Sequence, residues 1–134
     1  MKSELYLKVA KSISETSEHH KSHIGAVIVQ SHNILSVGVN TLKSHPVQAK
    51  YNQHRDVPIE YLKHCLHAEM SAILKAERLS DNLSNATLYI YREDKKGNLA
   101  MCRPCPACMA KIKEVGIRKL VYTTDLGIAK EVIA

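Results

Sequence analysis

Two short stretches of the sequence carry side chains that can bind a metal and move a proton. Residues 67–69 read H-A-E, and residues 102–108 read C-R-P-C-P-A-C, so that three cysteines fall within seven positions. One imidazole and two thiolates suit Zn²⁺, and three protein ligands leave the fourth position to water, as in catalytic zinc sites. These residue types therefore indicate a zinc site with a carboxylate beside it.

The three cysteines form two overlapping C-x-x-C pairs, and the prolines distinguish between them. Pro106 suits the first position of a helix, which places Cys105 at the helix cap and Cys108 in the first turn. Pro104 disfavours a helical turn at the residue before it, and this directs Cys102 away from the helix. We therefore expect Cys105 and Cys108 to be metal ligands and Cys102 to lie outside the site.

Two helices are predicted to begin at these stretches, one over residues 67–79 and one from the cysteines to about residue 115, with Gly116 as its C-cap. Residues two apart diverge by about 200° around a helix, so His67 and Glu69 reach one site only beyond the helix end. The positive end of the helix dipole then favours the thiolates that a metal needs. We predict His67 as the third metal ligand and Glu69 as the catalytic residue that carries a proton to and from water.

The order of the predicted elements indicates an α/β domain. Strand, helix and strand follow one another twice, which predicts at least two parallel strand pairs with right-handed crossovers beside an antiparallel hairpin. In layered sheets of this kind, sites collect where helix N-termini open at the ends of strands. The other predicted elements are a helix over residues 3–15 and strands over residues 24–30, 34–40, 87–91 and 118–124.

The composition bounds the class of protein. The 134 residues are 45% hydrophobic and 24% charged, which is ordinary for a soluble globular protein, so we expect a single domain over residues 1–134. No run approaches about 18 apolar residues, and the N-terminus lacks the apolar core of a signal peptide, so we expect no membrane association and a cytoplasmic location. In that compartment, clustered cysteines are more often metal-binding or catalytic than disulfide-bonded.

The charge favours an anionic partner. A formal net charge of +6 suits a molecule that carries phosphate, either a free nucleotide or a nucleic acid. Six tyrosines, with no phenylalanine or tryptophan, leave little for stacking nucleic-acid bases, so we favour a small-molecule substrate. Residues 42–61 hold Lys50 and Arg55, either of which would suit phosphate capture; the alternative is a solvated polar loop.

The order H-A-E and then P-C-P-A-C resembles the zinc signature of the cytidine and deoxycytidylate deaminase superfamily. Residues 24–30, 37–40 and 117–124 resemble strands of that family, so the resemblance covers most of the chain. It implies a three-layer α/β/α cytidine-deaminase-like fold with a mixed central sheet of four to five strands. Only ten residues follow Thr124, so the fifth strand is either a short stretch in residues 128–133 or absent.

The resemblance also implies the reaction. Zinc-bound hydroxide attacks the amino-bearing ring carbon of a cytosine nucleoside or nucleotide, with a deoxycytidylate-like substrate favoured, and ammonia is released. The side chain of Asn40 and the backbone of Ala68 are implied to bind the base, and Glu69 is implied to shuttle the proton. The family is commonly oligomeric, which implies a homo-oligomer.

Two alternatives remain open. One is a deaminase that acts on a base within RNA or DNA. The other is a non-catalytic, zinc-stabilised binding module, in which Cys102 would supply a fourth ligand; Glu69 argues against it, because a structural site needs no free carboxylate. Cys65 is expected to be buried by packing. Five further histidines are expected at the surface rather than as ligands: His19, His20, His23, His32 and His64.

Overall fold

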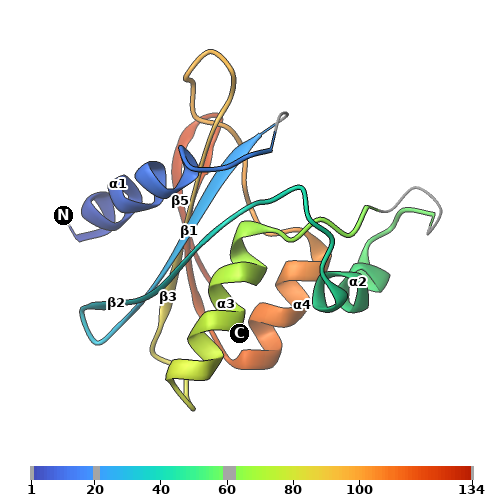
Figure 1. Cartoon of the computed structure of the whole chain (residues 1–134). Helices are drawn as coiled ribbons and strands as arrows, with labels where there is room; N and C mark the ends of the chain where they lie inside the picture. The colour runs from blue at the N-terminus through green and yellow to red at the C-terminus, as the bar shows by residue number, and fades with distance from the viewer. Residues whose placement is uncertain (1, 20–21, 59–62, 134) are drawn as a thin grey trace.

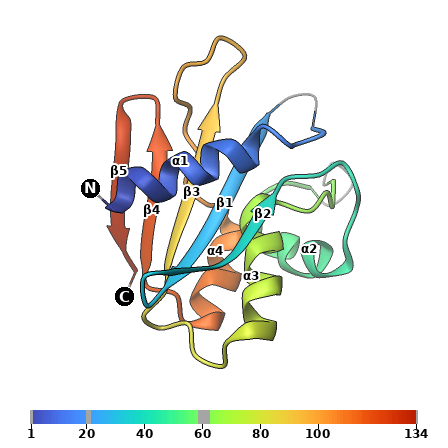
Figure 2. The same cartoon turned by 60° about the vertical axis from the view of Figure 1, so that its left-hand side comes forward.

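A mixed sheet of five strands forms the centre of the protein, with strands in the order β2-β1-β3-β4-β5 (Figure 2). The structure is a computed structural model, and it describes residues 2–19, 22–58 and 63–133. The predicted fold class, a three-layer α/β/α fold with a mixed sheet of four to five strands, is confirmed. The strands are β1 (His23–Gln30), β2 (Asn33–Val39), β3 (Thr87–Glu93), β4 (Lys119–Thr124) and β5 (Gly127–Val132).

The strand directions correct one prediction. β1 pairs antiparallel with both β2 and β3, β3 pairs parallel with β4, and β4 pairs antiparallel with β5. Among the described residues β3–β4 is thus the one parallel pair, where the sequence predicted at least two. β2 and β3 run in the same direction, but β1 lies between them, because the hairpin places its first strand on the inner side of the sheet.

The fifth strand is present as β5, although the sequence left open that it is absent. A two-residue turn at residues 125–126 follows β4 and returns the chain antiparallel to it, from Thr124↔Gly127 to Lys119↔Val132. Side chains along β5 alternate between half-buried and exposed, so one face of this strand packs against the protein and the other faces solvent. This alternation is typical of an antiparallel edge strand.

Helices cover both faces of the sheet (Figure 1). Helix α1 (Lys2–Ser14) packs against β1 and β3 on one face, while α3 (Ala68–Leu79) and α4 (Pro106–Val115) lie on the other. The larger core cluster lies between the sheet and α3 and α4, and a smaller one lies under α1. Within the described ranges, no helix is long and apolar enough to cross a membrane.

Glycine allows two helices to approach the sheet closely. A Cβ on Gly25 of β1 would lie 2.0 Å from the carbonyl oxygen of Ala10 in α1. A Cβ on Gly38 of β2 would lie 2.3 Å from the carbonyl oxygen of Ala68, the first residue of α3. Both distances are too short for any other residue, so Gly38 sets how close the beginning of α3 comes to the sheet.

The segment between β2 and α3 is more ordered than the sequence indicated. It contains a short helix α2 (Pro46–Tyr51) followed by a 3-10 turn η1 (Asn52–His54). Pro46 occupies the first turn of α2, and the side chain of His45 accepts a hydrogen bond from the N–H of Val47, which caps the helix. Residues 59–62 of this segment lie outside the described residues. The segment packs against α4 and borders the site described next.

Candidate metal centre and active site

Helices α3 and α4 begin at the two stretches that the sequence singled out. His67 is the N-cap of α3 and Cys105 is the N-cap of α4, both with extended backbone, and neither side chain caps its helix. Pro106 occupies the first turn of α4, and Gly116 ends the helix with a φ of 88°, as predicted. The side chains of both caps are therefore free to reach beyond the helix ends.

Three candidate ligand atoms meet at these helix starts. His67 Nδ1 lies 3.6 Å from Cys105 Sγ and 3.3 Å from Cys108 Sγ, and the three atoms all lie within 4.8 Å of one another. A tetrahedral Zn²⁺ with ordinary bond lengths would hold its nitrogen and sulfur ligands about 3.6 Å apart. The observed spacing fits that geometry, and all three residues are at least half-buried.

The protonation of the two thiols is coupled. A hydrogen bond from Cys108 lowers the pKa of Cys105 to about 4, and the neighbouring His67 acts in the same direction. The same hydrogen bond, together with burial, raises the pKa of Cys108 well above its ordinary value. Burial pulls the pKa of His67 down, but its hydrogen bond to Cys105 and the charge of Glu69 outweigh burial and raise it. Cys105 is thus held as a thiolate, which is the form of a cysteine that binds a metal.

Cys102 lies apart from the trio, as the proline spacing predicted. Its Sγ lies 3.1 Å from the hydroxyl of Thr123 and 3.5 Å from the carbonyl oxygen of Ile90. Burial raises the pKa of this thiol to about 11, which keeps it protonated at neutral pH. Cys102 is therefore not a fourth candidate ligand.

Glu69 is a buried carboxylate beside the three candidate ligands and is not one of them. The residue is 5% exposed, and it lies in the first turn of α3. Burial raises its pKa, and the positive charge of His67 only partly opposes this. Burial thus shifts the carboxyl group toward its protonated form, in the direction that suits a general acid and base.

A cavity of about 400 Å³ opens onto this cluster. It is lined by the predicted site residues Asn40, His67, Glu69 and Cys105, and by others from the sheet and from the loop after β2. Its size lies within the range of small-molecule sites, about 300–1,000 Å³. Ala68, the first residue of α3, is fully buried and is not among the lining residues.

The comparison with known families matches this geometry. A family model described as the cytidine and deoxycytidylate deaminase zinc-binding region matches residues 1–124. The chain belongs to this family. Members of the family are hydrolases of C–N bonds, and a carboxylate beside a His-Cys-Cys cluster is the constellation expected of its zinc-dependent chemistry.

Individual relatives agree with the family assignment. An uncharacterized deaminase of Aliivibrio fischeri is 31% identical over 115 residues, which cover 86% of this chain and 67% of the relative. A deoxycytidylate deaminase of Mycobacterium phage D29 is 30% identical over 132 residues, which cover 91% and 94%. The crystal structure of a dCMP deaminase from cyanophage S-TIM5 matches the fold with a TM-score of 0.62 at 24% identity, over 90% of this chain and 80% of that one.

Asn40, the residue predicted to bind the base, is largely occupied in this member of the family. Its Oδ1 accepts hydrogen bonds from Ser17 Oγ at 2.7 Å and from the N–H of Ile24 at 2.9 Å. Its Nδ2 donates to the carbonyl oxygen of Ser22 at 2.8 Å. A side-chain amide has two N–H groups, so one remains for a molecule in the cavity.

Gln48 positions His67, and sequence reasoning missed it. Gln48 is fully buried in α2, and its Oε1 accepts a hydrogen bond from the N–H of His67 at 3.1 Å. Its Nε2 donates to Oδ1 of the equally buried Asn52 at 2.9 Å. The two residues are four apart and share one face of a short helical segment, but a single sequence does not reveal that this polar face is buried.

The predictions for the cations of the loop, for Cys65 and for the histidines are confirmed only in part. Arg55 lines the cavity, whereas Lys50 is exposed and lies over the ring of Tyr51 instead. Cys65 was expected to be buried, but it is half-buried and lines the cavity, because its strand-like segment forms the cavity wall. His19 also lines the cavity, while His20 lies outside the described residues.

Proposed function

We propose that this protein is a zinc-dependent deaminase of a free cytosine nucleotide, with deoxycytidylate as the favoured substrate. The observation that carries the proposal is the position of Glu69, a buried carboxylate with a raised pKa beside three ligand atoms but outside them. The substrate class is supported by the phage D29 relative, which is named a deoxycytidylate deaminase. It is also supported by the size of the cavity.

The metal would be held by His67, Cys105 and Cys108, whose spacing fits Zn²⁺. When bound there, Zn²⁺ lowers the pKa of a water molecule to about 7 and so supplies hydroxide at neutral pH. The chain holds the backbone of His67 in place, because Gln48 accepts a hydrogen bond from its N–H.

Glu69 would carry the protons of the reaction. It takes one proton from the attacking water and delivers it to the ring nitrogen next to the amino-bearing carbon. It then takes the remaining proton of the added hydroxyl group and gives it to the leaving amino group. Oxygen from water replaces nitrogen on the ring carbon, and ammonia departs, so the atoms balance. A raised pKa makes the Glu69 carboxylate a better proton acceptor than an exposed glutamate.

The base would be oriented by groups at the cavity wall. The free N–H of Asn40 is available to a carbonyl oxygen of the base or to a sugar oxygen. Ala68 begins α3, so its N–H has no partner within the helix and would be the backbone group that contacts the base, if the base reaches the beginning of this helix. A non-catalytic zinc module is disfavoured, since Cys102 bonds elsewhere and supplies no fourth ligand.

The test combines metal content with turnover. Purified protein is expected to contain about one zinc per chain and to release ammonia from deoxycytidine monophosphate. The same assay is run with alternative substrates: cytidine, deoxycytidine, adenosine, guanine and short RNA and DNA oligonucleotides. Turnover only on oligonucleotides would indicate that the substrate is a nucleic acid and not a free nucleotide. Bound zinc without turnover on any substrate would indicate a non-catalytic binding module.

Glu69→Gln is the decisive variant, with Glu4→Gln on exposed α1 as the matched control. Loss of a general acid and base lowers kcat by about 100- to 10,000-fold, and the zinc content should stay unchanged. Glu4→Gln should match the wild type in both measurements. Full turnover by Glu69→Gln would contradict the assigned role.

A further inference from the structure

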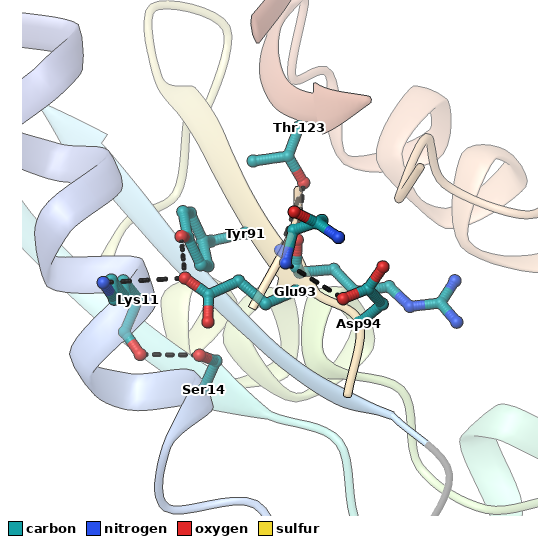
Figure 3. Close-up of polar contacts among 8 residues, drawn as sticks. Lys11, Ser14, Tyr91, Glu93, Asp94 and Thr123 are labelled. Carbon is teal, nitrogen blue, oxygen red and sulfur yellow. Dashed lines mark hydrogen bonds and ion pairs between the residues drawn. The ribbon is translucent and has the colours of Figure 1, made fainter. Parts of the chain in front are cut away.

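The side chain of Arg92 faces the cavity because its neighbours on β3 face the other side of the sheet. Tyr91 donates a hydrogen bond to Glu93, and Glu93 Oε1 lies 3.5 Å from Nζ of Lys11 in α1. Figure 3 shows Glu93 between Tyr91 and Lys11 on the side of α1. Side chains alternate along a strand, so Arg92 points to the opposite face, where it lines the cavity.

The end of β3 holds Arg92 firmly in place. Its backbone N–H donates to the buried hydroxyl of Thr123 at 3.1 Å, and its carbonyl oxygen accepts from Ala100 at 3.0 Å. One guanidinium nitrogen, Nη1, donates to the carbonyl oxygen of Met101 at 3.1 Å. The guanidinium is thus oriented by a neutral carbonyl and not by a carboxylate.

The remaining donors of Arg92 have no acceptor in the part of the chain that the structure describes. Its Nε is buried, and no hydrogen-bond partner for it exists among the described residues. Nor does any Asp or Glu in the described ranges form an ion pair with its guanidinium. Buried polar groups are nearly always paired in folded proteins, so the unpaired Nε shows that the described residues leave part of the hydrogen-bonding capacity of Arg92 unused.

The charges around the cavity point to an anionic ligand. Four cationic side chains line it, against one carboxylate, Glu69. Of these cations, Arg103 is engaged by Glu131, and Lys63 is exposed. Arg55 is half-buried and forms no ion pair with the described residues. A guanidinium offers two parallel N–H groups that match the oxygens of a phosphate.

We propose that Arg92 is a specificity-determining residue that binds the phosphate of the substrate, so that a cytosine nucleoside monophosphate is preferred over the free nucleoside. The proposal rests on the proposed function, since it concerns the same cavity. The two terminal guanidinium nitrogens supply the donors: Nη2 has no partner among the described residues, and Nη1 keeps a second N–H while its first is bonded to Met101. Arg55 lines the same cavity and adds positive charge there, but the proposal does not require it to contact the phosphate directly.

The kinetic test compares two substrates that differ only in the phosphate. For Arg92→Gln, kcat/KM for deoxycytidine monophosphate should fall about 10- to 100-fold, the loss expected for a charged hydrogen bond. For deoxycytidine it should change less than about threefold, because that substrate has no phosphate to lose. Arg92→Lys should recover part of the loss, and most of the effect should fall on KM.

Arg118→Gln is the matched control, because Arg118 is exposed and does not line the cavity. It removes the same charge and should leave both substrates unaffected. Thermal melts of all variants show whether they are folded. An equal loss for both substrates would overturn the proposal and indicate that Arg92 only supports the structure, and no loss for the monophosphate would overturn it outright.

A binding measurement separates this proposal from the proposed reaction. Calorimetry with deoxyuridine monophosphate and with deoxyuridine, the expected products, needs no turnover. Tighter binding of the monophosphate to wild type than to Arg92→Gln supports the phosphate contact even if deamination fails. Equal binding of both products to the wild-type protein overturns the phosphate contact, even if deoxycytidine is deaminated.

Discussion

Arg103 and Glu131 form a two-point ion pair that ties the last strand to the loop carrying the candidate metal ligands. Arg103 Nε and Nη2 donate to the two carboxylate oxygens of Glu131 at 2.9 and 2.8 Å, and Tyr122 donates to the same carboxylate at 3.0 Å. Arg103 stands two residues before Cys105, and Glu131 belongs to β5. β5 therefore holds in place the loop that precedes Cys105.

Glu131→Gln is expected to lower the free energy of unfolding at pH 7 by about 0.5–1 kcal/mol, the upper part of the range for exposed pairs, because the geometry is bidentate. Arg103 lowers the pKa of Glu131 from its ordinary 4.5. The folded-state pKa lies below the unfolded one, so the stabilisation is complete above pH 4.5 and is lost as the pH falls through the folded-state value. Urea unfolding at several pH values measures this difference, and a gap between wild type and variant that persists in acid would contradict it.

Cysteine substitutions should separate the metal ligands from their neighbour. Cys105→Ser and Cys108→Ser should each lose most of the bound zinc, since each removes one of three ligand atoms. Cys102→Ser should keep its zinc, because its thiol bonds to Thr123 instead. Zinc per chain by mass spectrometry of the metal checks all three.

Removal of the metal by a chelator should lower the melting temperature of the wild type and of Cys102→Ser by similar amounts. The melting temperatures of Cys105→Ser and Cys108→Ser should hardly respond. Loss of zinc from Cys102→Ser, in protein that is still folded, would show that this cysteine does take part in the metal site.

Two glycine substitutions should distinguish the two faces of the sheet. Gly25→Ala and Gly38→Ala both force a Cβ into helix backbone, at 2.0 and 2.3 Å, and each should destabilise the fold by about 1–3 kcal/mol or more. Gly38 contacts Ala68 at the beginning of α3, so Gly38→Ala should also reduce zinc content and turnover of the folded fraction. Gly25→Ala should not, because α1 lies on the far face of the sheet. Equal effects of both on zinc would contradict this reasoning.

Gln48→Leu should weaken the metal site from outside it. The change leaves the buried N–H of His67 without its acceptor, which costs about 1–3 kcal/mol of stability. Loss of a partner of a metal ligand typically lowers metal affinity about 10- to 100-fold. Competition with a chromogenic chelator measures the affinity, and Gln53→Leu, an exposed glutamine in the same segment, is the matched control. An unchanged zinc affinity in Gln48→Leu would remove its positioning role.

Short-range signals in the sequence determined where the helices of the site begin and end. Pro106 at the first turn of α4, Gly116 past its end, and the proline before Cys105 act on adjacent residues, so their effect depends little on the rest of the fold. The same signals separated Cys105 and Cys108 from Cys102. Because both ligand-bearing stretches lie at helix starts, the sequence also indicated that they would open toward a common site.

Only the tertiary structure decided what surrounds these helix starts. The order of the strands depends on pairing between distant segments, and this is why β1 lies inside the sheet and one predicted parallel pair does not form. The contacts of Gln48 with His67 and of Arg103 with Glu131 join residues 19 and 28 positions apart. Arg92 faces the cavity because side chains alternate along β3 and α1 covers the other face of that strand. Burial and charge pairing at such positions are products of packing, which no local pattern of residues specifies.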